Sequence, residues 1–202
     1  MTIGAKLLAS LVRDGNEGDV NGLVVIPPPD IDAIRRSGEA SVTLRLGRWF
    51  LSMRQSNVTH ISTYKTTSDV GEARIGKKHF VPFGSDFVVH PGRFVLASTL
   101  EWIRIPAHLT AYVVGKSSLG RRGIIIETAA GVHPGFSGCL TLEIANVGEV
   151  PVQLTPGMNI CQIFLHRVEG ETSEAKTKFS GRRRPAIGAL SADPVLKRLQ
   201  RD

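Results

Sequence analysis

The chain has 202 residues, of which 42% are apolar, and its 25 basic and 18 acidic side chains give a net charge of +7. This length fits one domain with a substantial core, and no apolar run reaches the roughly 18–20 residues that cross a bilayer. We therefore expect a cytoplasmic protein with no membrane partner, whose positive charge favours anionic ligands.

The first half of the chain predicts one helix and then a change to strands. Residues 4–13 predict a short helix that ends near Asp14 and Gly15, and the rigid connector VIPPPD leads into the polar segment IDAIRRSGEA. From residue 41 the apolar residues alternate with a period of two, which is typical of strands. Residues 54–80 are polar and irregular, and predict a long loop or lid that contains one short strand.

Short strands are predicted over most of the remaining chain. The runs are FVPFGSDFVVHPGRFVLASTLEWIRIP, TAYVVG, GIIIET, CLTLEIANVG, VPVQLTPG and MNICQIFLHRV, each closed by Gly, Pro or Asn. Strands this short and frequent, without helical stretches between them, favour an all-β sandwich or distorted barrel. The strand pattern stops after Gly170. We therefore expect a β domain with an N-terminal helix over residues 1–170 and a mobile tail over residues 171–202.

The two cysteines, Cys139 and Cys161, both lie in apolar, strand-like runs. We expect them to be small buried side chains and not a disulfide. Neither has a Cys-x-x-Cys partner or a histidine at ligand spacing, so no metal site is predicted from them.

Glu143 is the charged residue of an otherwise apolar strand. Alternation in CLTLEIANV places Leu140, Leu142 and Ile144 on one face and Glu143 on the other. The glutamate is then either a carboxylate on the sheet surface or a general acid–base group in a partly desolvated cleft. In the second case burial would raise its pKa toward the working pH.

The segment GKSSLGRRG, residues 115–123, joins two predicted strands. It is either a solvated basic turn or a phosphate cradle built from serine hydroxyls, backbone N–H groups and an arginine fork. Its spacing is not that of a Walker A loop. This cluster and GRRRP, residues 181–185, fit a compact polyphosphate better than nucleic acid, because no interleaved aromatic residues or reading motif accompany them.

Several motifs together resemble those of a known family. GKSSLGRRG, TAAGVHPGFSG, LTLEIANVGEVPVQLTPGMNICQI and FVVHPGRFVLASTLEWIRIP resemble the dCTP deaminases, across roughly residues 41–185. The resemblance implies the all-β, dUTPase-like fold, a distorted barrel or jelly roll. It also implies a homotrimer with active sites between subunits, dCTP as substrate, and Mg²⁺ bound through the substrate phosphates with no zinc ion. The double-serine loop is similar to that of the bifunctional branch, which converts dCTP to dUMP.

The resemblance also implies roles for individual residues. Glu143 matches the catalytic glutamate, which activates water to attack C4 of cytosine, and Ser117, Arg121 and Ala130 complete the implied catalytic group. The residues implied to bind substrate are Lys116, Ser117, Ser118 and Arg121 at the phosphates, Thr128, Ala129 and Gly131 in the hairpin that reads the base, Gln162 in the last strand, and Lys178, Phe179 and Arg183 in the tail that closes over the triphosphate.

Two positions depart from the family pattern. His133 stands where the hairpin usually has an aspartate, which lies by the deoxyribose in the deaminases and activates water in the diphosphatases. An imidazole does not replace a carboxylate in that role. Thr43 stands where an aspartate is common, which we interpret as a structural change. The sequence therefore favours deamination of dCTP to dUTP and ammonia over the dUMP-forming reaction, and it leaves open a non-catalytic nucleotide-binding regulator.

Overall fold

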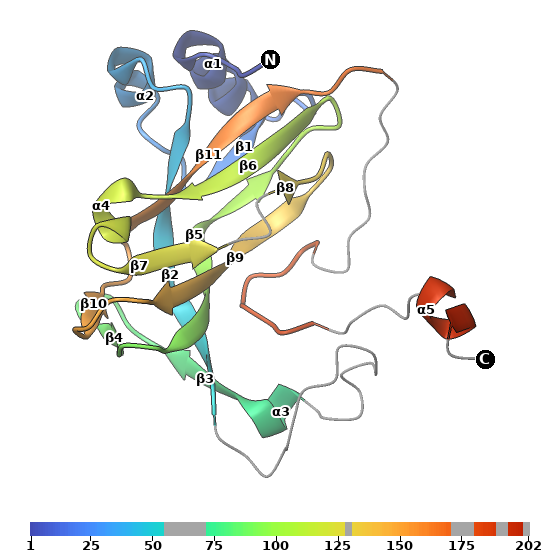
Figure 1. Cartoon of the computed structure of the whole chain (residues 1–202). Coiled ribbons are helices and arrows are strands. Elements are labelled where there is room, and N and C mark those ends of the chain that lie inside the picture. The colour runs from blue at the N-terminus through green and yellow to red at the C-terminus, as the bar shows by residue number, and fades with distance from the viewer. Residues whose placement is uncertain (55–71, 128–130, 171–179, 189–193, 200–202) are drawn as a thin grey trace.

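The computed structural model describes residues 1–54, 72–127, 131–170, 180–188 and 194–199, and it confirms an all-β fold with few helices (Figure 1). The helices are α1 (Ala5–Asn16), α2 (Ile31–Ser37), α3 (Glu72–Ile75), α4 (Ser117–Gly120) and α5 (Pro194–Leu199). The strands are β1 (Val24–Ile26), β2 (Val42–Met53), β3 (Gly76–Phe80), β4 (Phe87–Val89), β5 (Phe94–Arg104), β6 (Leu109–Gly115), β7 (Ile124–Glu127), β8 (Gly131–Val132), β9 (Ser137–Asn146), β10 (Val152–Leu154) and β11 (Asn159–Arg167). None of the helices described is long and apolar enough to cross a membrane.

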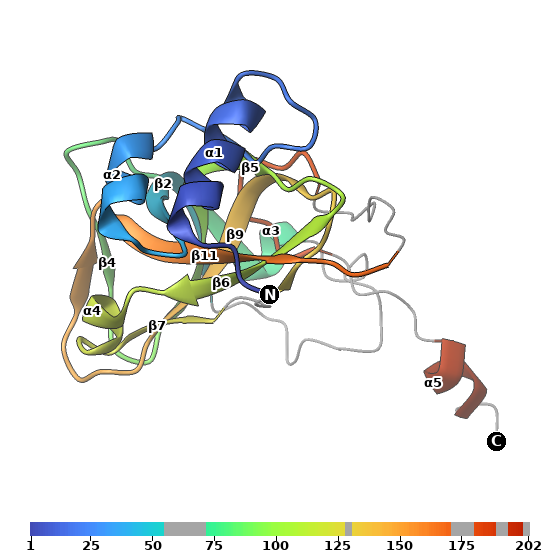
Figure 2. The same ribbon diagram turned by 90° about the horizontal axis from the view of Figure 1, so that it is seen from above.

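One large antiparallel sheet forms the body of the molecule. Its strand order is β7-β9-β5-β2-β11-β6-β8, with β1 added on β5 and β3 on β2, while β4 and β10 form a separate small sheet. The first residues of β2 pair with β11 and its later residues pair with β5 and β3, with a shift of register between Leu46 and Phe50. The sheet therefore bends along β2 into a half-barrel, as predicted (Figures 1 and 2).

The hydrophobic core lies inside this half-barrel. In β9 every second residue is buried, and Leu142 and Ile144 are fully enclosed. Helix α1 adds Leu8 and Val12 to the same core, and α2 lies beside α1 (Figure 2). Enclosing one such aliphatic side chain contributes about 1.5–3 kcal/mol. The period-two pattern of the sequence therefore decides which face of each strand points inward.

Helix α1 confirms the predicted N-terminal helix but runs on to Asn16. The extension passes through Gly15, where a Cβ atom would lie 2.5 Å from the backbone oxygen of Leu23. The last turn is held from outside the helix, because Asn16 Oδ1 accepts a hydrogen bond from the backbone N–H of Val25 at 2.9 Å. This close packing against the next segment explains why a glycine does not end the helix here.

Helix α2 and strand β1 were not predicted. Asp30 caps α2 by accepting a hydrogen bond from the backbone N–H of Ala33 at 2.8 Å, and Gly38 ends the helix with a φ of 70°. No residue of α2 is buried, so the segment lacks the apolar period that reveals a helix. In the region predicted as a lid, the expected short strand is β3, whereas residues 55–71 lie outside the described part of the chain.

Candidate active site

The segment predicted as a phosphate cradle folds as the single helical turn α4 between β6 and β7. Leu119 is buried and packs the turn against the body of the protein, where α4 contacts β7. The side chains of Ser117, Ser118 and Arg121 are exposed. One buried apolar residue thus holds the turn while the predicted phosphate ligands face solvent.

Lys116 precedes α4 and lies in a network of neutral oxygen atoms. Its Nζ donates hydrogen bonds to Thr43 Oγ1 at 2.7 Å and to Gln162 Oε1 at 3.0 Å. The Ser41 hydroxyl donates to the same Gln162 oxygen at 3.4 Å. Gln162 and Thr43 are direct neighbours across the β11–β2 pair. Among the described residues no carboxylate lies within 4 Å of Lys116 Nζ. The positive charge of this side chain is therefore not compensated by an ion pair within the described part of the chain.

Thr43 and Ser41 are members of this network that sequence reasoning did not assign to the site. Thr43 was interpreted as a structural change, yet its hydroxyl contacts a predicted phosphate ligand. The sequence did contain a signal for Thr43, because this residue stands where an aspartate is common in the family. Ser41 gave no signal, because its role depends on the pairing of strands that are distant in sequence.

Glu143 lies on the outer face of β9, as the alternation predicted, and is half-buried. It pairs with Leu96 of β5 on one side and with Glu127 of β7 on the other. The chain leaves β7 at Glu127 and enters the predicted base-reading hairpin. Its residues Thr128, Ala129 and Ala130 lie outside the described part of the chain. The predicted hairpin therefore begins immediately after Glu127, the residue of β7 that is paired with Glu143 of β9.

The remaining predicted site residues lie in three places. Gly131 opens β8, where its neighbour across the strand pair is Tyr112 of β6, and His133 is exposed in the turn that follows. Lys178 and Phe179 belong to a segment outside the described residues. Arg183 lines a hollow on the outer face of the sheet, together with Cys139 of β9.

The two cysteines are free thiols, but only one is the buried side chain that was predicted. Cys161 is fully enclosed, and burial raises its pKa to about 12. Cys139 is half-buried, so the prediction for it is wrong. The period of β9 places Cys139 on the outer face with Glu143 and not in the core. Within the described ranges, no three His, Cys, Asp or Glu side chains gather in a way that could hold a metal ion.

A solved structure shares this architecture. The crystal structure of 2′-deoxycytidine 5′-triphosphate deaminase from Agrobacterium tumefaciens aligns with 83% of this chain at a TM-score of 0.59 and 21% identity. The chain spans about half of that protein's length, 48%. The common feature is the all-β, dUTPase-like fold.

Sequence comparison gives the family. The profile of the dCTP deaminase-like family matches residues 21–168. The dCTP deaminase of Halorubrum lacusprofundi is 40% identical over 185 residues, covering 88% of this chain and 87% of the relative. The dUMP-forming dCTP deaminase of Corynebacterium glutamicum is 40% identical over 180 residues, covering 86% and 91%. This chain belongs to the dCTP deaminase-like family.

Proposed function

We propose that the protein is an enzyme that hydrolyses dCTP to dUTP and ammonia. The observation that carries the proposal is the position of Glu143. It is a half-buried carboxylate in the centre of an apolar strand, beside the end of β7 from which the base-reading hairpin starts. A general acid–base group needs this combination of partial desolvation and proximity to the base.

The proposed chemistry is a water-for-amine exchange at C4 of cytosine. Glu143 accepts a proton from water as the water oxygen bonds to C4, and it then donates a proton to the amino nitrogen. The C4–N4 bond breaks, ammonia leaves and a carbonyl remains, so the atoms balance as dCTP plus water giving dUTP plus ammonia. General acid–base catalysis of this kind contributes about 10²–10⁴-fold, and positioning together with dipoles aimed at the developing charge supplies the remainder.

The triphosphate is proposed to bind at α4. Lys116 is held by neutral oxygens, and Ser117, Ser118 and Arg121 present exposed donors. Charge-assisted hydrogen bonds from such donors suit phosphate oxygens. We propose that Mg²⁺ enters as a complex with the substrate phosphates. We also propose a homotrimer as the active form, which light scattering would report as three times the chain mass of 21.9 kDa.

The test of the chemistry is Glu143→Gln in the full-length protein. With dCTP and Mg²⁺, ammonia release should fall by about 10²–10⁴-fold, while binding of dCTP is retained. Glu149, exposed in the turn after β9, supplies the matched control Glu149→Gln, which should behave as wild type. Ammonia release that persists in Glu143→Gln would overturn the assignment.

A second candidate reaction, formation of dUMP and pyrophosphate from dCTP, is favoured by the dUMP-forming relatives at 40% identity. It needs an activator for the water that attacks the phosphates, and His133 stands where the family has aspartate. Chromatography of the products separates the two reactions, because dUTP marks deamination alone and dUMP with pyrophosphate marks both steps. If dUMP is found, His133→Ala decides whether the imidazole takes part.

A further inference from the structure

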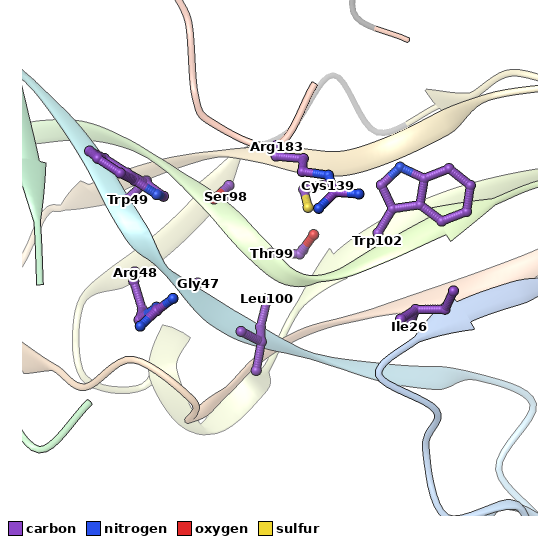
Figure 3. A pocket seen from close by; sticks show the side chains of 10 residues that line it. All are labelled: Ile26, Gly47, Arg48, Trp49, Ser98, Thr99, Leu100, Trp102, Cys139 and Arg183. Carbon is purple, nitrogen blue, oxygen red and sulfur yellow. The ribbon is translucent and has the colours of Figure 1, made fainter. Parts of the chain in front are cut away.

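The hollow on the outer face of the sheet holds the tail of the chain. The Cys139 N–H donates a hydrogen bond to Arg182 O at 2.8 Å, and the next residue, Arg183, lines the hollow (Figure 3). Because Arg183 is predicted to bind the triphosphate, this hollow belongs with the candidate active site. A different cavity, of about 340 Å³, lies where the end of β2 meets β4 and the start of β5. It is lined by residues 52–54, 87–90 and 93–95, and none of the predicted site residues belongs to this lining.

The walls of this second cavity lie on the core side of the sheet. Val89 and Val95, which both line it, are members of the hydrophobic core. Val95 is paired with Ile144 of β9, whose side chain is fully enclosed. Glu143, the preceding residue of β9, points to the outer face, because successive residues of a strand point to opposite faces. The sheet therefore separates these walls from the proposed catalytic carboxylate.

An aromatic ring with fixed orientation forms part of the lining. Phe87 stacks on Phe50 with the ring centres 4.5 Å apart, and the His79 ring meets Phe87 edge-on at 5.4 Å. A hydrogen bond of 2.8 Å joins His79 Nε2 to Ser52 Oγ, so the hydroxyl of Ser52 is also fixed in the lining. Cavities with aromatic walls and a few fixed polar groups are typical ligand sites.

The turn between β4 and β5 supplies His90 and Arg93 to the lining and is itself rigid. The Arg93 N–H donates to His90 O at 3.1 Å and closes the turn. The Gly92 N–H donates to Asn146 O at 2.8 Å, and the Asn146 N–H donates to Arg93 O at 3.1 Å. Asn146 is buried, and its side-chain amide donates to Val89 O at 2.8 Å. These bonds to the end of β9 hold the two basic residues in place.

The charged residues of the lining are all basic. They are Arg54, His90 and Arg93, and all three are exposed. Arg54 is oriented by a hydrogen bond from its Nε to Arg74 O at 3.2 Å. Within the described ranges, no carboxylate lies within 4 Å of the Arg93 guanidinium. The cavity therefore combines an apolar interior with an opening that attracts anions.

We propose that this cavity is a second binding site, for a small organic anion, that is, a carboxylate or a phosphate carried on a short apolar body. The apolar body packs on Phe87 and Val95, and the anionic group accepts charge-assisted hydrogen bonds from Arg93 and His90. The cavity volume of about 340 Å³ lies in the range of small-molecule sites, roughly 300–1,000 Å³. This site goes beyond the deaminase function proposed above and does not depend on turnover.

Isothermal titration calorimetry of the full-length protein with phenyl phosphate and with benzoate tests the proposal. At least one of the two should bind saturably, and the tighter one identifies the anionic group. Phenol and inorganic phosphate each lack half of the ligand. They should bind at least about tenfold more weakly than phenyl phosphate, since each loses contacts worth a kcal/mol or more. No binding of either ring compound, or inorganic phosphate binding as tightly as phenyl phosphate, would overturn the proposal.

Arg93→Gln locates the binding in this cavity. It should weaken binding of the tighter ligand about tenfold or more and leave ammonia release from dCTP unchanged. The matched control Arg35→Gln removes an exposed arginine of α2, outside the lining, and should leave the affinity unchanged. An unaltered affinity in Arg93→Gln would refute the site.

Competition with dCTP separates this site from the catalytic one. It is measured in Glu143→Gln, where dCTP should bind without turnover. Saturating dCTP should leave binding of the ring compound unchanged, and its displacement would place the ligand in the active site and refute the proposal. A protein that binds the ligand as described but releases no ammonia from dCTP would support the second site and refute the deaminase function.

Discussion

The ammonium of Lys116 lies 2.7 Å from the hydroxyl oxygen of Thr43. Thr43 lies in β2, which is distant from Lys116 in the sequence and is brought beside it by the fold. A threonine in this position fixes the lysine without neutralising it. An aspartate, which is common here in the family, would form an ion pair with the lysine. The side chain at position 43 therefore sets how much of the Lys116 charge is available to a phosphate.

The first prediction concerns this charge. Thr43→Asp should raise the KM for dCTP about 10- to 100-fold, because the proposed charge-assisted contact of Lys116 with the substrate phosphates, worth about 1.5–3 kcal/mol, is lost. kcat should change little, since Glu143 is untouched. Thr43→Ser keeps the hydroxyl and should restore the wild-type KM. Steady-state kinetics at several salt concentrations would check this, and an unchanged KM in Thr43→Asp would contradict it.

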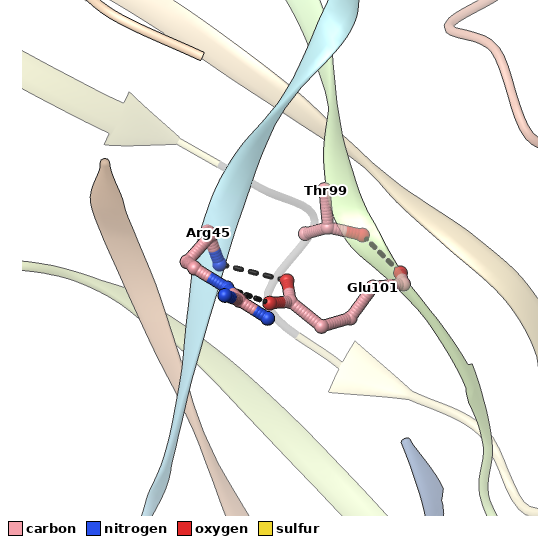
Figure 4. A network of polar contacts seen from close by, with 3 residues as sticks. All are labelled: Arg45, Thr99 and Glu101. Carbon is pink, nitrogen blue, oxygen red and sulfur yellow. Dashed lines mark hydrogen bonds and ion pairs between the residues drawn. The ribbon is translucent and has the colours of Figure 1, made fainter. Parts of the chain in front are cut away.

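The second prediction concerns the buried pair of Glu101 and Arg45 (Figure 4). The Glu101 carboxylate accepts from the Arg45 backbone N–H at 2.7 Å and from its Nε at 2.6 Å, and only 3% of the Glu101 side chain is exposed. Glu101→Gln should lower the free energy of unfolding by about 2 kcal/mol. This loss is smaller than for a fully buried ion pair, because water reaches the partly exposed guanidinium of Arg45. Urea unfolding measures the loss. The exposed counterpart Glu149→Gln should stay within about 0.5 kcal/mol of wild type.

The third prediction concerns thiol reactivity. Burial raises the pKa of Cys139, Arg183 opposes this, and Glu101 adds to it. Because the thiolate is the reactive form, alkylation of Cys139 by iodoacetamide at pH 8 should be slower than that of a free cysteine, and it should accelerate steadily as the pH rises. Arg183→Ala should slow it further, because a charge that favours the thiolate is removed. Mass spectrometry of the labelled peptides measures both rates, and faster labelling in Arg183→Ala would contradict the prediction.

Cys161 provides the internal reference for that experiment. Its pKa is raised to about 12 and its side chain is fully buried, so it should stay unlabelled in the folded protein. Labelling of Cys161 at the rate of Cys139 would show that the protein had unfolded during the reaction.

The fourth prediction concerns Gly138, which has a φ of +145° and faces the tail. A Cβ atom there would lie 3.0 Å from Arg182 O, so Gly138→Ala combines backbone strain with a collision. The tail should detach from β9, and trypsin should cleave after Arg182 or Arg183 several-fold faster than in wild type. Gly4→Ala, where an added Cβ meets nothing within 4 Å, is the control and should leave cleavage unchanged.

Sequence reasoning succeeded where local pattern determines structure. The alternation in β9 predicted that Leu142 is buried and that Glu143 faces outward, and both are confirmed. It failed where long-range pairing decides. The Lys116 contact with Thr43 spans 73 residues and depends on the register between β2 and β11. Helix α2 escaped prediction for another reason, because it buries no side chain and so carries no apolar period.

Strand β9 contributes one face to the core and the other to the surface that carries Glu143 and Cys139. Successive residues of a strand point to opposite faces, so deletion of a single residue would exchange the two sets from that point onward. It would bring Glu143 into the core and expose the aliphatic side chains. Substitutions at one position change one face only, whereas any change of length alters both. Strand β9 should therefore tolerate substitutions of single residues better than insertions or deletions, because a change of length disturbs both the core and the surface that carries Glu143.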